Sequence, residues 1–208
     1  MKAERTAVAL LGAATMLALL TGGGGEPDME TTADVRERAE AVYFDYREQT
    51  NLVLAIIDEG PWAVGGSAEY GMVPSSSGCD DGWKFDLTRS TTIDPASVDG
   101  LREEVAAHLD DAGFTVEGME LGAEGEGSGD VIVRQQGVFS LLVVTFVDNG
   151  NVLVKATTAC QHGDARELGK ALFGDARLAE GYLPSEESPS DPLFFGITPG
   201  DPQFAPAP

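Results

Sequence analysis

Three consecutive segments between Asp130 and Cys160 have the composition of β-strands, and they constrain the fold of this chain more than any other feature. They read VIVRQQG, VFSLLVVTFV and VLVKATTAC, rich in Val, Phe, Leu and Thr, with turn residues between them. Asn149-Gly150 separates the second from the third. This pair is typical of a type I′ hairpin turn, whose two central residues both need a positive φ. The sequence therefore predicts an antiparallel β-meander.

An earlier segment has the alternation of a half-buried strand. Trp83, Phe85 and Leu87 alternate with polar residues, a period of two that turns one face toward a core. The later segment 138–147 is apolar on both faces. Such a strand is expected in the centre of a sheet, where neighbours cover it.

A long helix is expected before the first strand. It begins near Asp34, with Thr32 or Asp34 as N-cap, and Gly60-Pro61 ends it. Its length of about 24 residues is roughly twice that of an average helix, enough to cross the face of a small sheet. The expected apolar face consists of Val35, Ala39, Val42, Tyr46, Gln49, Val53 and Ile56.

A second helix follows Asp94-Pro95, which supplies an N-cap and a first-turn proline, and it ends at Gly113. The fold class is therefore α+β: an antiparallel β-meander sheet packed by a long N-terminal helix and a second helix.

Cys79 and Cys160 are the only cysteines of the chain. Two cysteines in an exported protein most often pair, whereas two reduced, buried thiols suit the cytosol better. Cys79 precedes one strand and Cys160 ends another, so a bond between them implies that these strands are antiparallel and close together. We predict a Cys79–Cys160 disulfide.

The first 25 residues have the features of a secretion signal. Two basic residues precede an apolar run over 7–20, which is shorter than the roughly 20 residues of a bilayer span. Leu20-Thr21-Gly22 resembles the start of a bacterial lipobox, but Gly23 stands where the acylated Cys is required. We expect residues 1–25 to be a signal peptide or an N-terminal anchor, and 26–33 a tether.

The remainder divides into a single α+β domain over 34–178 and a tail over 179–208. From Pro184 onward the tail contains seven of the eleven prolines and no Lys or Arg. This composition predicts a disordered, Pro-rich acidic tail. Leu193-Phe194-Phe195 within it is either a docking motif or a loosely packed flap, and the sequence favours neither.

The charge of the chain disfavours two classes of partner. With 35 Asp and Glu against 13 Lys and Arg, the formal net charge is −22. Such a surface repels the phosphates of nucleic acids and of anionic lipids. The sequence therefore predicts no nucleic-acid partner, and contact with a membrane only through the N-terminal segment, if that segment is not cleaved.

Motifs that carry chemistry are lacking. The sequence has no nucleophile elbow, no zinc-protease motif and no dinucleotide-binding glycine pattern. The acidic, glycine-rich stretch 122–129 superficially resembles a calcium loop. Gln135 stands where an EF-hand needs a bidentate Glu, and a hairpin loop is the favoured interpretation. We predict no catalytic residue, no cofactor and no metal site.

The chain resembles a class of actinobacterial envelope lipoproteins, the mycobacterial LppA-like group. The resemblance covers about residues 34–160. It rests on the secretion signal, the long first helix, Cys79-x-x-Gly82-Trp83 before a strand, the second helix, and a meander that ends in Thr158-x-Cys160. It implies an extracytoplasmic, surface-tethered protein with a binding or structural role.

Two functions follow as hypotheses. The first is an exported cell-envelope protein that is not an enzyme, secreted or anchored at the outer face of the cytoplasmic membrane, with an unknown envelope component or small ligand as partner. The alternative is an envelope-acting hydrolase with an unidentified carboxylate site, which would need two carboxyl groups in one cleft and a raised pKa on one of them.

Overall fold

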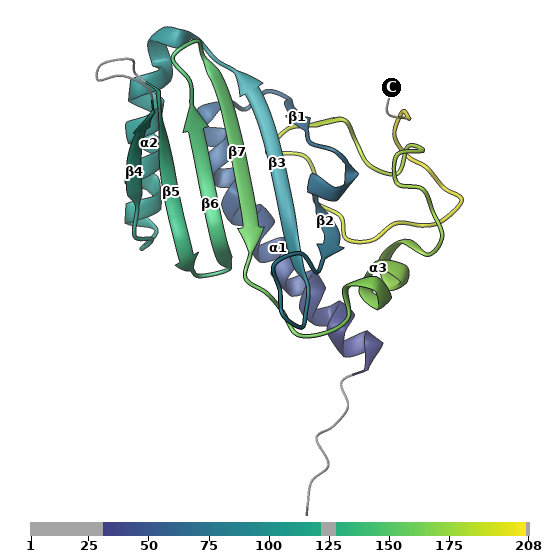
Figure 1. Ribbon diagram of the computed structural model, residues 1–208. Coiled ribbons are helices and arrows are strands. Elements are labelled where there is room, and N and C mark those ends of the chain that lie inside the picture. The colour runs from purple at the N-terminus through teal and green to yellow at the C-terminus, as the bar shows by residue number, and fades with distance from the viewer. Residues whose placement is uncertain (1–30, 122–127, 207–208) are drawn as a thin grey trace, which may run out of the picture.

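An eight-stranded antiparallel sheet organises the described part of the chain, with strand order β4-β5-β6-β7-β3-β1-β8 and β2 paired to β3. The structure, a computed structural model, describes residues 31–121 and 128–206. Figure 1 shows the sheet with α1 and α2 on one of its faces. The strands are β1 Trp62–Val64, β2 Tyr70–Ser75, β3 Lys84–Thr92, β4 Glu117–Leu121, β5 Ser128–Gln136, β6 Phe139–Phe146, β7 Asn151–Thr158 and β8 Glu186–Glu187. The helices are α1 Thr32–Ile57, α2 Val98–Asp111 and α3 Ala165–Phe173, with 3₁₀ turns at Ser67–Glu69 and Pro95–Ser97.

The predicted α+β class and the antiparallel meander are confirmed. β6 lies inside the sheet, between β5 and β7, as its apolar composition indicated. The hairpin between β6 and β7 is also present, but its turn type differs from the prediction. Gly150 has a φ of 88°, whereas Asn149 does not have a positive φ. Gly150 N–H donates to the carbonyl of Val147 at 2.8 Å, so the turn carries a single left-handed glycine at its end.

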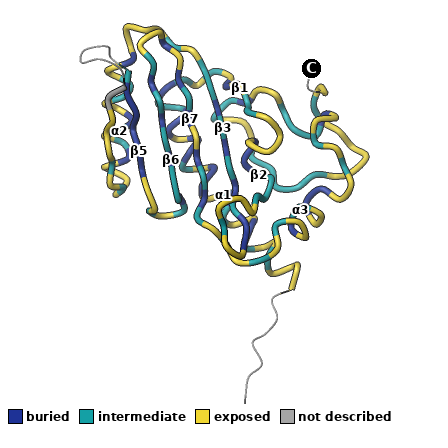
Figure 2. Tube along the Cα trace, in the orientation of Figure 1, coloured by how far each residue is buried: buried dark blue, intermediate teal, exposed yellow. Residues whose placement is uncertain are grey.

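The core lies between the helices and one face of the sheet. α1 packs against β7 and α2 against β5, and Figure 2 shows that buried residues concentrate on the strands and on α1. Alternate strand positions line up across the sheet in rows. One such row contains Val131, Val144, Val154 and Arg89, all of them buried, so an arginine stands where three strands supply valine.

α1 begins earlier than expected, and its buried face differs from the predicted apolar face. The N-cap is Thr31, not Thr32 or Asp34. Asp34 N–H donates to the Thr31 hydroxyl, and the Asp34 carboxylate accepts from Thr31 N–H at 3.0 Å, which is a capping box. Val35, Val42, Gln49 and Ile56 are only half-buried. The residues of α1 that are buried are Ala39, Tyr43, Tyr46, Arg47, Thr50, Asn51, Val53, Leu54 and Ile57.

The tail over 179–208 was predicted to be disordered, and the structure differs. We call residues 186–206 the C-terminal segment. β8 pairs with β1, Glu187 is buried, and Phe194 and Phe195 pack on Tyr70 and Tyr43 with ring centroids 5.9 and 5.2 Å apart. The apolar spot in the tail therefore docks within its own chain. Since these residues cover one side of α1, the buried face of the helix extends to Arg47, Thr50 and Asn51.

The predicted disulfide is confirmed. Cys79 and Cys160 are bonded, with Cα atoms 5.8 Å apart, and β3 and β7 are antiparallel neighbours as the bond required. Trp83 and Gln161 extend this pairing by two backbone hydrogen bonds of 2.8 and 2.7 Å. Trp83 is fully buried, and its indole N–H donates to the carbonyl of His162 at 3.1 Å. The bond thus fastens the start of β3 to the end of β7.

Reduction of Cys79–Cys160 is expected to lower the melting temperature without changing the fold at low temperature. The bond joins residues 81 apart. In the chain-entropy model a loop of this size stabilises the folded state by about 4–5 kcal/mol. Thermal unfolding followed by circular dichroism, with and without a reducing agent, measures the shift. A Cys79→Ser/Cys160→Ser variant is the control, and its melting temperature should not respond to the reductant. An unchanged melting temperature for the reduced native chain would contradict the prediction.

Candidate functional site

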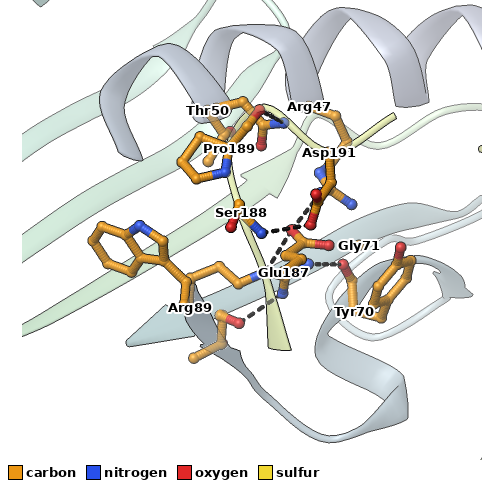
Figure 3. A network of polar contacts seen from close by, with 12 residues as sticks. Arg47, Thr50, Tyr70, Gly71, Arg89, Glu187, Ser188, Pro189 and Asp191 are labelled. Carbon is orange, nitrogen blue, oxygen red and sulfur yellow. Dashed lines mark hydrogen bonds and ion pairs between the residues drawn. The ribbon is translucent and has the colours of Figure 1, made fainter. Parts of the chain in front are cut away.

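One carboxylate from the C-terminal segment lies between two buried arginines. Glu187 Oε1 accepts from Arg47 Nη2 at 2.5 Å and from Arg89 Nε at 2.8 Å. The exposed fractions are 1% for Arg47, 0% for Arg89 and 7% for Glu187. Figure 3 shows Glu187 in this position, between α1 above and β3 below. We call these three residues the Glu187 network.

Arg89 has further acceptors for its remaining N–H groups. Its guanidinium donates to the carbonyl oxygens of Thr88 and Tyr70, both at 2.8 Å, and of Glu69 at 3.3 Å. The same guanidinium lies over the ring of Tyr70, 5.3 Å from the centroid. These contacts satisfy a charge that burial would otherwise make costly.

Tyrosines complete the surroundings of the Glu187 network. Arg47 donates to the Tyr43 hydroxyl at 3.1 Å and lies over the rings of Tyr43 and Tyr70. Burial raises the pKa of Tyr43, of Tyr46 and of Tyr70, so each phenol stays protonated well above neutral pH. The Tyr46 hydroxyl is therefore a donor, and it bonds the carbonyl of Gly71.

Gly71 is required at this position for two reasons. Its φ of 112° lies in the region that favours glycine. In addition, a Cβ at residue 71 would collide with the Tyr46 hydroxyl. The close approach of α1 to β2 depends on this glycine.

The Glu187 network holds the C-terminal segment along α1. Figure 3 shows Ser188, Pro189 and Asp191 beside the helix. The Asn51 side-chain amide donates to the carbonyl of Pro189 at 3.1 Å. The Asp191 carboxylate accepts from Ser188 N–H at 2.7 Å, which closes a tight turn. One wall of a groove is thereby formed by the segment and the other by α1.

This groove, which we call the α1 groove, has a volume of about 600 Å³. Apolar side chains form a large part of its surface, and Leu52 is 57% exposed there. Its lining consists of Glu48, Asn51, Leu52, Ala55 and Glu59 from α1 and Pro189, Ser190, Asp191 and Leu193 from the C-terminal segment. Ligand sites are typically concave, mostly apolar and of about this size.

Asn51 is a buried polar residue in the lining of the α1 groove. It is 9% exposed, and its Oδ1 has no hydrogen-bond partner among the described residues. A buried carbonyl oxygen without a donor costs about 1–3 kcal/mol.

A second hollow, of about 650 Å³, lies among β2, β3, β7 and the start of α3. Serine and threonine hydroxyls line it, together with the exposed Lys155 and Arg166. None of its described polar side chains is both buried and without a partner. The α1 groove is therefore the stronger candidate for a binding site.

The sequence prediction did not identify the α1 groove. It named Cys79 and Cys160, which the structure brings together but which do not line the groove. A signal was nevertheless present in β3. The alternation that puts Phe85 and Leu87 on the buried face also puts Arg89 there, and a core-facing arginine needs a carboxylate from elsewhere in the chain.

The hydrolase hypothesis needs a carboxyl group with a raised pKa. Two described carboxyl groups have a shifted pKa, and both shifts are in the opposite direction. Asp34 and Asp164 are N-caps, and hydrogen bonds from Thr31 and from the backbone of Glu167 and Arg166 lower their pKa. These groups are built to stay ionised, so neither has the property of a general acid.

Within residues 31–121 and 128–206, no helix has the length and apolar character needed to span a membrane. The same residues include no group of three or more His, Cys, Asp or Glu side chains placed to hold a metal ion. Most of the glycine-rich stretch 122–129, considered above as a calcium loop, lies outside the described residues.

Comparisons of the chain with protein-family models, with curated proteins and with solved structures found no significant match.

Replacement of Glu187 by Gln is expected to destabilise the fold by about 3–5 kcal/mol, because it removes the only carboxylate that Arg47 and Arg89 share and leaves two buried charges. Chemical denaturation measures the loss. Limited proteolysis should also show faster cleavage within the C-terminal segment. Glu186→Gln is the matched control, since Glu186 is its neighbour on β8 but is exposed. Equal stability of the two variants would contradict a stabilising role of the network.

Proposed function

We propose that this chain is exported and acts outside the cytoplasm as a non-enzymatic binding protein, with the α1 groove as its ligand site. The observation that carries the proposal is the groove itself. It has the volume of a small-molecule site and a largely apolar surface.

The disulfide supports the proposed location. Structural disulfides persist in oxidising compartments, so the Cys79–Cys160 bond is consistent with an extracytoplasmic site of action. The basic and apolar residues of 1–25 give the sequence of a secretion signal, although this stretch lies outside the described residues. The resemblance to actinobacterial envelope lipoproteins points to the same location.

Attachment to the membrane is proposed only through the N-terminal segment, if that segment is retained. Gly23 has no sulfur to acylate, so the chain as it stands is not lipidated. The remaining surface is strongly acidic and repels anionic lipid. The ligand is accordingly a small molecule or an envelope component, and not a nucleic acid.

Export is tested by fractionation of cells that express the full chain. The chain is expected outside the cytoplasm, with Cys79 and Cys160 unreactive toward a thiol-specific reagent under non-reducing, denaturing conditions. Recovery of an intact chain starting at Met1 in the soluble cytoplasm, with two reactive thiols, would overturn the proposed location.

Binding in the α1 groove is tested with a neutral dye whose fluorescence rises in apolar surroundings. The form recovered outside the cytoplasm is expected to bind the dye. Leu52→Glu should weaken binding about tenfold, because it removes one leucine-sized apolar contact from the groove. Met119→Glu is the matched control. Met119 is 47% exposed, lies on β4 and does not line the groove, and its replacement adds the same charge.

The two variants together show whether the dye binds in the α1 groove or elsewhere on the surface. Dye binding that is lost only with Leu52→Glu supports the proposal. Dye binding that both variants leave unchanged, or no binding by the native chain, would overturn the groove as a ligand site.

A further inference from the structure

We propose that the ligand of the α1 groove is an amphipathic organic cation, with an ammonium group and an apolar body. This inference rests on the proposed function, because it assigns a ligand class to the same groove. It is carried by the charges of the residues that line the groove and by the apolar side chains among them.

The charged groups that line the groove are all acidic. Glu48 and Glu59 are exposed residues of α1, and Asp191 faces them from the C-terminal segment. No Lys or Arg is among the lining residues. Arg47, on the same helix, is buried and paired with Glu187. The groove thus presents carboxylates from both walls, and this arrangement favours a cation over a neutral molecule or an anion.

The hydrogen-bonding capacity of an ammonium group fits these carboxylates. An ammonium group carries three donors and no acceptor. It can donate to the carboxylates of the lining, whereas a carboxylate or phosphate group has no donor to offer.

The apolar part of the groove sets the second requirement. Leu52 and Ala55 of α1 lie opposite Pro189 and Leu193 of the C-terminal segment. Leu52 remains more than half exposed, a large aliphatic side chain in contact with water. A ligand with a hydrocarbon body would cover these side chains, and a purely polar polyamine would not.

The test compares four probes on the form recovered outside the cytoplasm: octylammonium, 1-octanol, octanoate and putrescine. Octylammonium is expected to bind about tenfold more tightly than 1-octanol, the effect of one charge-assisted hydrogen bond in a partly exposed site. Octanoate and putrescine should bind more weakly than 1-octanol and octylammonium, respectively. Displacement of the neutral dye measures all four affinities. The preference for octylammonium over 1-octanol should shrink as the salt concentration is raised to about 1 M.

A pair of double variants separates the groove from the general acidity of the chain. Glu48→Gln/Glu59→Gln should lose most of the preference for octylammonium over 1-octanol. Glu103→Gln/Glu104→Gln changes the net charge equally at exposed positions of α2 and should retain the preference. Glu103 and Glu104 do not line the α1 groove, so dye binding by that control pair should equal that of the native chain.

The outcomes distinguish this inference from the proposed function. Equal affinity for octylammonium and 1-octanol, with dye binding still sensitive to Leu52→Glu, overturns the cation and leaves the groove as a binding site. Putrescine binding as tightly as octylammonium overturns the amphipathic requirement. Equal loss of preference in both double variants shows that net charge alone attracts the probe. Absence of dye binding overturns the proposed function as well.

Discussion

The carboxylate of Glu187 is the contact on which the arrangement of this molecule depends. Arg47 comes from α1 and Arg89 from β3, and both are buried. Among the described residues, Glu187 is the carboxylate with which both form ion pairs. Because one oxygen of Glu187 accepts from both, the C-terminal segment is held against the helix and the sheet together. The position of that segment in turn creates the α1 groove, so a buried ion network determines where an external surface becomes concave. The stabilising value of such a network comes chiefly from the cost of leaving its charges unpaired.

Two long-range constraints, the disulfide and the Glu187 network, act on opposite sides of β3. The disulfide joins Cys79, five residues before β3, to Cys160, two residues after β7. Glu187 reaches Arg89 from the β1 side of β3. β3 is therefore tied to its neighbour on one side by a covalent bond and to the C-terminal segment by charge. The α1 groove lies on the side of β3 that the Glu187 network holds, and no disulfide of the described residues lies on that side.

Sequence patterns predicted the parts of the fold that local rules determine. The period of two in β3 and β6, the proline after Asp94 and the positions of the two cysteines all correspond to elements of the structure. The tail was predicted incorrectly because its composition indicates too little apolar surface to fold alone, whereas its order comes from Glu187 and from Phe194 and Phe195 packing on distant residues. The buried face of α1 was misplaced for the same reason. The α1 groove is formed by the C-terminal segment and by α1. Local sequence rules predicted neither the order of that segment nor the buried face of that helix, so they did not predict the groove.

The position of Glu187 in the chain also has a consequence for the order in which the molecule is completed. Glu187 follows Arg47 by 140 residues and Arg89 by 98, and it lies near the C-terminal end of the sequence. A chain that emerges from the ribosome or from a translocation pore presents both arginines long before their carboxylate. Until that residue arrives, closing the core would bury two cations without an anion, a state that the free energy of burial opposes. We therefore expect the core around Arg47 and Arg89 to close only after Glu187 has been synthesised.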